Sequence, residues 1–528
     1  MNAALTISVR LFYEALWMRV TTRKISILIA LLLALGGCAS GPIDYPREFS
    51  EAVSGTQDTF LGREVADFLI EHPGKSGFYP LSSGIDALGA RVSLMDQAEQ
   101  TIDAQYFLMK ADEAGLIFAA KMLEAADRGV RVRFLLDDIF TSVDDRGLLL
   151  LDEHPNIEVR LFNPIARSGF YYLNFLGDFK RANRRMHNKS FIVDNQMVIV
   201  GGRNIAAEYF ELKDDKVFVD FDMLGVGPVA PEISKTFDRF WNHEFSVPVA
   251  AFADQHTDKQ LAATREKIEK ALEEAGDSAY AAAIDSRFIR DVQDDLIALY
   301  PATATVVTDD PEKLQHKASN EFRVLINAVT AALESAKSEV IIVTPYMIPG
   351  EGGMGLIEQL TSRGVRVVVF TNSLASTNHV SVHGGYSRYR KPMLRAGVEL
   401  HEARANAGSV AGESGEDEYE ALTLHTKGII IDRRITFIGS LNVDPRSVDI
   451  NTEMGVLIES TELSEQLASA VDSRLAAISY KVELDENGKL KWRTIIDGVE
   501  VIETSEPLSS RWRRFKAYVS KILPESQL

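Results

Sequence analysis

Cysteine is almost absent from this sequence. Cys38 is the only cysteine among 528 residues, so no disulfide can form within the chain. No C-x-x-C pair, a spacing typical of zinc sites, is present either. The hydrophobic (46%) and charged (25%) fractions are those of an ordinary folded protein.

The sequence also lacks an excess of basic residues. Asp and Glu number 76 against 57 Lys and Arg, which gives a formal net charge of -19. A protein that binds nucleic acid non-specifically normally presents a basic face to the phosphates. The balance therefore disfavours a nucleic-acid partner, although a basic cleft within an acidic protein would escape this argument.

The apolar run at residues 25–35 is shorter than the roughly 20 residues that a membrane-spanning helix needs. Arg23 and Lys24 precede it, and the small residues 36–38 follow it. A basic segment, a short apolar core and small residues are the order of an export signal. We therefore predict that residues 1–37 are a signal peptide.

The end of this segment resembles the bacterial lipobox, in which a cysteine receives diacylglycerol and becomes the mature N-terminus. The matching residues are Leu35-Gly36-Gly37-Cys38. The resemblance implies a protein of the bacterial cell envelope that is lipid-anchored through Cys38 and faces the periplasm. The alternatives are an uncleaved anchor or a small buried thiol.

The chain contains an internal repeat. An apolar run, a helical stretch, an Arg-Gly-Val-Arg-Val turn and a second apolar run occupy residues 101–136, and the same order recurs at residues 340–370. Such units predict parallel strands joined by helical crossovers, so we expect an α/β fold made of two duplicated halves.

We divide the chain at changes in composition. We expect a signal peptide (1–37), an N-terminal arm (38–75), a first α/β half (76–256), a helical connector (257–315), a second half (316–480) and a C-terminal extension (481–528). Residues 406–420 are acidic and rich in Gly and Ser, which is typical of a solvated loop, with a lid over a site as the alternative.

Each half carries one copy of the pattern H-x-K-x4-D-x6-G-[GS]-x-N. The copies are His187, Lys189, Asp194 and Asn204, and His425, Lys427, Asp432 and Asn442. On a strand, residues two apart project to the same face, so each histidine and its lysine point at one spot. The strand directs the two aspartates away from that face, which favours a structural role for them. Two complete copies make a chance match improbable.

These residue types suit attack on a phosphodiester. The lysines and asparagines would bind the anionic oxygens, one neutral histidine would attack phosphorus, and the other would exchange protons with the leaving and entering oxygens. We therefore expect the two histidines to differ in protonation state and to titrate together. Asp220 and Glu453 lie at comparable places downstream of the motifs, and we expect them to orient the imidazoles. We predict no metal and no cofactor, because the lysines would repel a cation.

The paired motifs resemble those of the phospholipase D superfamily, and they are most similar to its cardiolipin synthase C-like branch. The resemblance rests on the segments 185–190, 201–205, 383–391, 439–447 and 451–453. It implies two phospholipase D-like α/β/α halves that form a pseudo-dimer with one active site at the interface. It also implies that Asp194 and Asp432 belong to the catalytic motif and that His187 is the nucleophile of a phosphohistidine pathway.

The same resemblance implies a phosphatidyltransferase, cardiolipin synthase, that acts at the membrane surface. Its substrates would be phosphatidylglycerol and phosphatidylethanolamine, and it would need no nucleic acid and no obligate protein partner. The alternatives are a hydrolytic phospholipase D that releases phosphatidic acid and a secreted phosphodiesterase or nuclease.

Two further basic segments are candidates for lipid contact. Arg388, Arg390 and Lys391 would contact a lipid headgroup or else belong to the surface of an amphipathic helix. Residues 511–523 are basic, aromatic and compatible with a helix. That composition suits an interfacial helix on anionic lipid, and an ordinary helix packed on the protein is the alternative.

Overall fold

The computed structural model describes residues 45–167, 178–212, 217–275, 279–294, 297–316, 319–407, 422–496, 498–522 and 524–525. The predicted signal peptide, Cys38 and nearly all of the predicted 406–420 loop lie outside the described residues. None of the helices within these ranges is long and apolar enough to span a bilayer.

The first half is an eight-stranded sheet with helices on both faces. Its strands, in spatial order, are β1 (Ser76–Leu81), β8 (Asp222–Val226), β6 (Met197–Gly201), β5 (Ser190–Val193), β2 (Thr101–Tyr106), β3 (Arg131–Asp137), β4 (Ile157–Phe162) and β9 (Ser246–Pro248). Its main helices are α4 (Gly84–Gln97), α5 (Glu113–Asp127), α6 (Asp145–Asp152) and α9 (Val229–Trp241). Short helices α2 (Phe60–Glu64) and α3 (Ala66–Glu71) precede the sheet, and α8 (Phe179–Ala182) precedes β5.

The second half repeats this order strand for strand and adds two further strands at its outer edge. Its sheet runs β10 (Tyr300–Thr308), β17 (Met454–Glu459), β16 (Ile435–Gly439), β15 (Gly428–Ile431), β11 (Glu339–Val343), β12 (Arg366–Asn372), β13 (Glu399–Ala403), β18 (Ser479–Leu484), β19 (Leu490–Ile496) and β20 (Val499–Glu503). Its helices are α13 (Val324–Glu334), α14 (Gly350–Ser362), α15 (Val380–Tyr386), α16 (Arg390–Arg395), α18 (Pro445–Asp449) and α19 (Thr461–Ile478), and α20 (Arg511–Ser520) is the last helix along the described residues. The predicted duplication is therefore visible in the fold.

The structure places the boundaries of the second half differently from the sequence analysis. The connector contains the expected helices α10 (Asp258–Ala275), α11 (Ala279–Ile284) and α12 (Arg287–Gln293), but it then forms strand β10. β10 is the counterpart of β1, so the second half begins near residue 300. At the other end, β18 pairs with β13 as β9 pairs with β4, so the half continues past residue 480.

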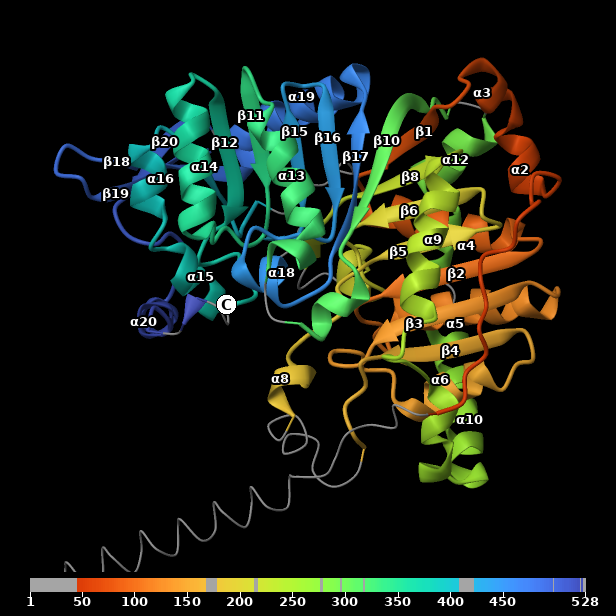
Figure 1. Ribbon diagram of the computed structural model, residues 1–528. Coiled ribbons are helices and arrows are strands. Elements are labelled where there is room, and N and C mark those ends of the chain that lie inside the picture. The colour runs from red at the N-terminus through yellow and green to blue at the C-terminus, as the bar shows by residue number, and fades with distance from the viewer. Residues whose placement is uncertain are drawn as a thin grey trace, which may run out of the picture.

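The two sheets join through their equivalent first strands. β1 and β10 are antiparallel and pair Ser76 with Ala302 and Phe78 with Tyr300. The described residues therefore form one continuous sheet of 18 strands (Figure 1). Apolar residues of α9 and of both sheets fill the seam beside this junction, among them Phe237, Trp241, Ile438 and Val456.

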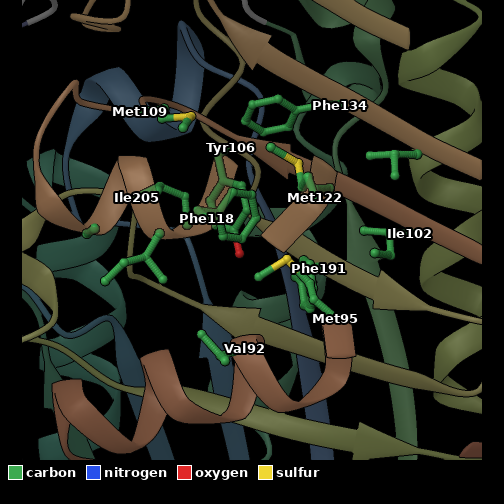
Figure 2. Close-up of a cluster of buried hydrophobic side chains, with 14 of the residues drawn as sticks. Val92, Met95, Ile102, Tyr106, Met109, Phe118, Met122, Phe134, Phe191 and Ile205 are labelled. Atoms are coloured by element: carbon green, nitrogen blue, oxygen red, sulfur yellow. The ribbon is translucent and has the colours of Figure 1, made fainter. Parts of the chain in front are cut away.

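A separate core fills the space between α4, α5 and the first sheet (Figure 2). Phe118 of α5 lies at its centre, with ring centroids 5.8 Å from Tyr106, 5.9 Å from Phe134 and 5.7 Å from Phe191. Burying such rings is worth several kcal/mol relative to smaller side chains. This packing fixes β5, which directly follows the motif residues His187 and Lys189.

Candidate active site

Both motif histidines lie at the seam between the halves, just before strands β5 and β15. The backbone N–H of His187 donates to the carbonyl of Thr452 in the second half (2.9 Å). The N–H of His425 donates to the carbonyl of Val219 in the first half (2.7 Å). Next to this second contact, β7 (Val217–Val219) and β14 (Leu422–Leu424) form a parallel two-stranded sheet. Each histidine segment is therefore held by backbone of the other half.

The two orienting carboxylates also cross the seam. His187 Nδ1 lies 2.7 Å from Glu453 Oε2, and His425 Nδ1 lies 2.6 Å from Asp220 Oδ2. All four side chains are buried. An Nδ1–H that donates to a carboxylate leaves the lone pair of Nε2 free, which is the tautomer that a nucleophilic imidazole needs. The structure thus brings Asp220 and Glu453 to the histidines, but each carboxylate serves the histidine of the other half.

The glycines of the motif make room for these carboxylates. A Cβ on Gly202 would lie 2.2 Å from Asp220 Oδ1, so no larger residue fits there. The equivalent position in the second half is Ser440, whose hydroxyl donates to Glu453 Oε2. In the first half, the group that approaches the glycine closely is therefore the carboxylate of Asp220.

The two lysines lie beside the imidazoles. Lys189 Nζ donates to the carbonyl of His187 (2.6 Å), and Lys427 Nζ lies 2.9 Å and 3.2 Å from His425 Nδ1 and Nε2. Burial lowers the pKa of Lys189 to about 7 and that of Lys427 to about 8, although Glu453 and Asp220 oppose the shift. A phosphodiester anion placed here would meet two ammonium groups whose charge is sensitive to pH near neutrality.

The pKa values of both motif histidines are lowered. Burial lowers the pKa of His187 to about 4, and burial together with Lys427 lowers the pKa of His425 to about 3. Both imidazoles are therefore neutral at pH 7 in the free protein, whereas the sequence analysis expected opposite protonation states. Burial opposes ionisation of Asp220 and Glu453, but the facing histidines and lysines outweigh it, and the pKa of each carboxyl is below its usual value.

The two motif asparagines are buried, and Asn204 is linked to His425 through Tyr209. Asn204 Nδ2 donates to Tyr209 Oη (3.0 Å), and the ring of Tyr209 lies 5.1 Å from that of His425. Within the described part of the chain, Oδ1 of Asn204 and Oδ1 of Asn442 are buried without a hydrogen-bond partner. Because the oxygen and nitrogen of an amide exchange by a flip of the side chain, such an amide can turn a donor toward a bound anion.

The structure does not bring Asp194 and Asp432 to the histidines. Asp194 follows β5, at the opposite end of the strand from His187, and its carboxylate accepts from the backbone N–H groups of residues 99, 100 and 101 at 2.8–3.0 Å. Asp432 likewise accepts from residues 337, 338 and 339. Both aspartates tie the end of their own strand to the start of the neighbouring strand. Asp194 and Asp432 match the catalytic motif in sequence, but in the structure both bind backbone N–H groups away from the histidines.

Two phenylalanine side chains that contact the motif histidines are functional candidates that were not predicted from the sequence. Phe107 lies edge-on to His187 with ring centroids 4.8 Å apart, and Lys189 Nζ is 5.4 Å from the same ring. On the other side, the ring of Phe218 lies 5.4 Å from that of His425. Residue 107 follows β2 and residue 218 lies in β7, so their positions beside the site depend on tertiary packing.

Arg390, one of the three basic residues proposed for headgroup contact, is not available to a headgroup. Arg390 is buried and forms ion pairs with Glu402 (2.6 Å) and Glu506 (2.5 Å). His379 and His383 share an H-x-x-x-H spacing, but Arg390 Nη2 lies 2.9 Å from His383 Nε2, and this cation would repel a metal ion. Across the described ranges no group of three or more His, Cys, Asp or Glu residues is arranged to hold a metal.

Comparison with known proteins gives one consistent family. The model of the family "Cardiolipin synthase, PLD-like domain" matches twice, at residues 92–241 and 329–475. Cardiolipin synthase C of Escherichia coli K12 is 36% identical over 471 residues, which cover 88% of this chain and 98% of that protein. An uncharacterized protein of Helicobacter pylori strain 26695 is 32% identical over 96% of this chain and 100% of its own length.

The fold is also similar to a solved structure. The phosphatidylserine synthase of Haemophilus influenzae Rd KW20 superposes with a TM-score of 0.50 and 14% identity, over 79% of this chain and 91% of that chain. At this level of identity the likeness concerns the fold alone. The paired family matches and the duplicated sheet agree on two equivalent domains in one chain.

Proposed function

The chain belongs to the cardiolipin synthase family with PLD-like domains, and on that premise we propose that it transfers phosphatidyl groups between membrane phospholipids to make cardiolipin. The observation that carries the proposal is the crossed pair of histidine–carboxylate contacts, with both lysines beside it, in one buried site at the seam. A site with two imidazoles and two ammonium groups suits a phosphodiester better than an uncharged ester.

In the first step, neutral His187 attacks phosphorus through Nε2 while protonated His425 donates to the leaving headgroup oxygen. The bond from phosphorus to that oxygen breaks, and a phosphatidyl-histidine and a free alcohol result. The bound anion and Asp220 together stabilise the protonated form of His425, whose pKa is low in the free protein. The amides of Asn204 and Asn442 complete the set of donors around the phosphate.

In the second step, the hydroxyl of an acceptor lipid gives its proton to neutral His425 and attacks phosphorus. The bond from phosphorus to His187 Nε2 breaks, and the histidine returns to its starting state. With phosphatidylglycerol as acceptor the product is cardiolipin. Water in place of the acceptor would give phosphatidic acid by the same steps, so exclusion of water by the buried site decides the outcome.

We further propose that the protein is held at the cell envelope by a lipid on Cys38, facing the periplasm. An anchored enzyme meets a lipid substrate at high effective concentration. Cys38→Ala should abolish incorporation of labelled fatty acid into the protein, and labelling that persists in this variant would refute the anchor.

The test of the activity uses purified protein with vesicles of mixed phosphatidylglycerol and phosphatidylethanolamine, with His187→Ala as the inactive control. Lipid mass spectrometry should find cardiolipin, and the released alcohol, glycerol or ethanolamine, identifies the donor. Phosphatidic acid as the sole product would make the protein a hydrolytic phospholipase D. Activity that survives in His187→Ala would overturn the two-histidine mechanism.

A further inference from the structure

The C-terminal helix α20 packs on the protein through its small and polar side. Ala517 is buried, and Arg513 Nε donates to the carbonyl of Leu374 (2.6 Å) while the same guanidinium also reaches the carbonyl of Thr377. A Cβ on Gly384 of α15 would lie 2.8 Å from the carbonyl oxygen of Ala517, so the two helices touch backbone to backbone. The contact needs no large apolar side chain from α20.

The apolar side of this helix faces solvent. The exposed fractions are 63% for Trp512, 53% for Phe515, 70% for Tyr518 and 83% for Ile522. With 3.6 residues per turn, Trp512, Phe515 and Tyr518 share one side of α20 and Ala517 lies on the opposite side, while Ile522 lies in the turn that follows the helix. A surface helix normally turns its apolar stripe toward the core, so α20 is oriented in the reverse sense.

Cations accompany the exposed rings. Lys516 Nζ lies 5.5 Å from the ring centre of Trp512, and Lys521 Nζ lies 5.9 Å from that of Tyr518. These residues give α20 a positive, aromatic surface on a chain whose formal net charge is -19. Aromatic rings beside lysines are the composition of helices that lie in the interface of anionic membranes.

We propose that α20 docks the enzyme on an anionic phospholipid surface, with its exposed aromatic side in the headgroup layer. This inference rests on the proposed function, because an enzyme that acts on membrane phospholipids has to bind the membrane surface. The loop that Arg513 holds, residues 373–377, is bound to the segment before His425 through Thr423 Oγ1, which donates to the carbonyl of Ser376 (2.8 Å). The proposed membrane-contact helix is thus linked through this loop to the segment that carries His425.

The test is a local probe of the helix. In a Cys38→Ser background, Ile522→Cys and Ile70→Cys each carry one environment-sensitive nitrobenzoxadiazole label. Ile70 of α3 is the matched control because it is an isoleucine with 76% exposure, and α3 lies at the opposite end of the molecule in Figure 1. Both proteins retain the same N-terminal segment, so any attachment through that segment is common to them.

We expect phosphatidylglycerol vesicles to shift the emission of the label at position 522 to the blue and to leave the label at position 70 unchanged. Pure phosphatidylcholine vesicles should give a weaker shift. No shift at 522, or equal shifts at both positions, would overturn the proposal. A blue shift at 522 that grows with protein concentration in the absence of lipid would mean that a second copy covers the helix, and would also overturn it.

A second measurement separates this inference from the proposed activity. Lys516→Gln with Lys521→Gln should weaken vesicle partitioning by about fivefold per charge, or about 25-fold together. Turnover on vesicles should fall accordingly, whereas turnover on phosphatidylglycerol dispersed in detergent should stay at the level of the unaltered protein. Equal turnover on vesicles would refute the docking role. An unaltered protein that is inactive on both forms of lipid would refute the proposed function and leave the fluorescence test valid.

Discussion

The crossed carboxylates give the sharpest prediction. Asp220 belongs to the first half but contacts His425 of the second half at 2.6 Å, in a site where both side chains are buried. Opposite charges roughly 4 Å apart at an effective dielectric constant of about 20 attract by about 4 kcal/mol. Asp220→Asn removes this attraction for the protonated imidazole and should lower kcat by about a thousandfold. The near-isosteric amide leaves the packing in place.

The assay compares four variants on a phosphatidyl ester of p-nitrophenol, a leaving group that needs no protonation. The variants are Asp220→Asn, Glu453→Gln, His187→Asn and His425→Asn. If His187 is the nucleophile, loss of His425 function should still allow a burst of p-nitrophenol, followed by slow turnover and a covalent lipid adduct on His187. Because the carboxylates cross the seam, Asp220→Asn should show the same burst, and Glu453→Gln should show none.

The grouping of the variants is what the structure predicts, whichever histidine is the nucleophile. Asp220→Asn should behave as His425→Asn does, and Glu453→Gln as His187→Asn does. If Asp220→Asn instead behaves as His187→Asn, each carboxylate acts within its own half and the crossed arrangement is refuted. A loss below about tenfold in Asp220→Asn would refute the electrostatic argument itself.

Three other predictions follow from the site. Burial lowers the pKa of Lys189 to about 7 and that of Lys427 to about 8, so kcat/KM should fall as the pH rises through this range and the ammonium charges are lost. Lys189→Arg stays charged and should therefore shift the fall in kcat/KM to higher pH. A pH profile that Lys189→Arg leaves unchanged would contradict the assignment of this fall to Lys189. Asp194→Asn places an amide nitrogen or a weaker acceptor against three backbone N–H groups, so the free energy of unfolding in urea should fall by about 1–3 kcal/mol. The kcat per folded molecule should stay unchanged. A large loss of kcat would show that Asp194 takes part in catalysis. Chelation with EDTA should leave the rate intact, because Lys189 and Lys427 lie where a catalytic cation would have to bind, and strong inhibition would point to a metal.

The local part of the site was predictable from the sequence. The two-residue offset between His187 and Lys189 recurs at His425 and Lys427, although both pairs lie just before β5 and β15 and not on the strands as expected. Asp194 was expected to lie away from His187 for an equally local reason, because six residues separate them and four of these form β5. Patterns of this kind depend on neighbours in the chain and survive any arrangement of the halves.

The pairing across the seam was not predictable from one sequence. The order of residues places Asp220 downstream of His187, and only the packing of the two sheets decides that its partner is His425. The strand β10 is a different case, because Thr303, Thr305 and Val307 are β-branched and typical of a strand. The residues before β10 have a helical composition, so the connector was predicted to extend through β10 to residue 315. The predicted start of the second half is therefore later in the sequence than the start in the structure.

The crossing of the carboxylates has a consequence for the duplicated architecture. The first half contains His187, Lys189 and Asp220, yet Asp220 contacts the imidazole of His425 in the second half. Gly202 of the first half leaves the space that the Asp220 carboxylate occupies. Each half therefore supplies a histidine that lacks its orienting carboxylate and a carboxylate that lacks its histidine. Neither half alone completes either of the two histidine–carboxylate pairs, so the proposed chemistry requires the seam, which the pairings β1–β10 and β7–β14 hold together.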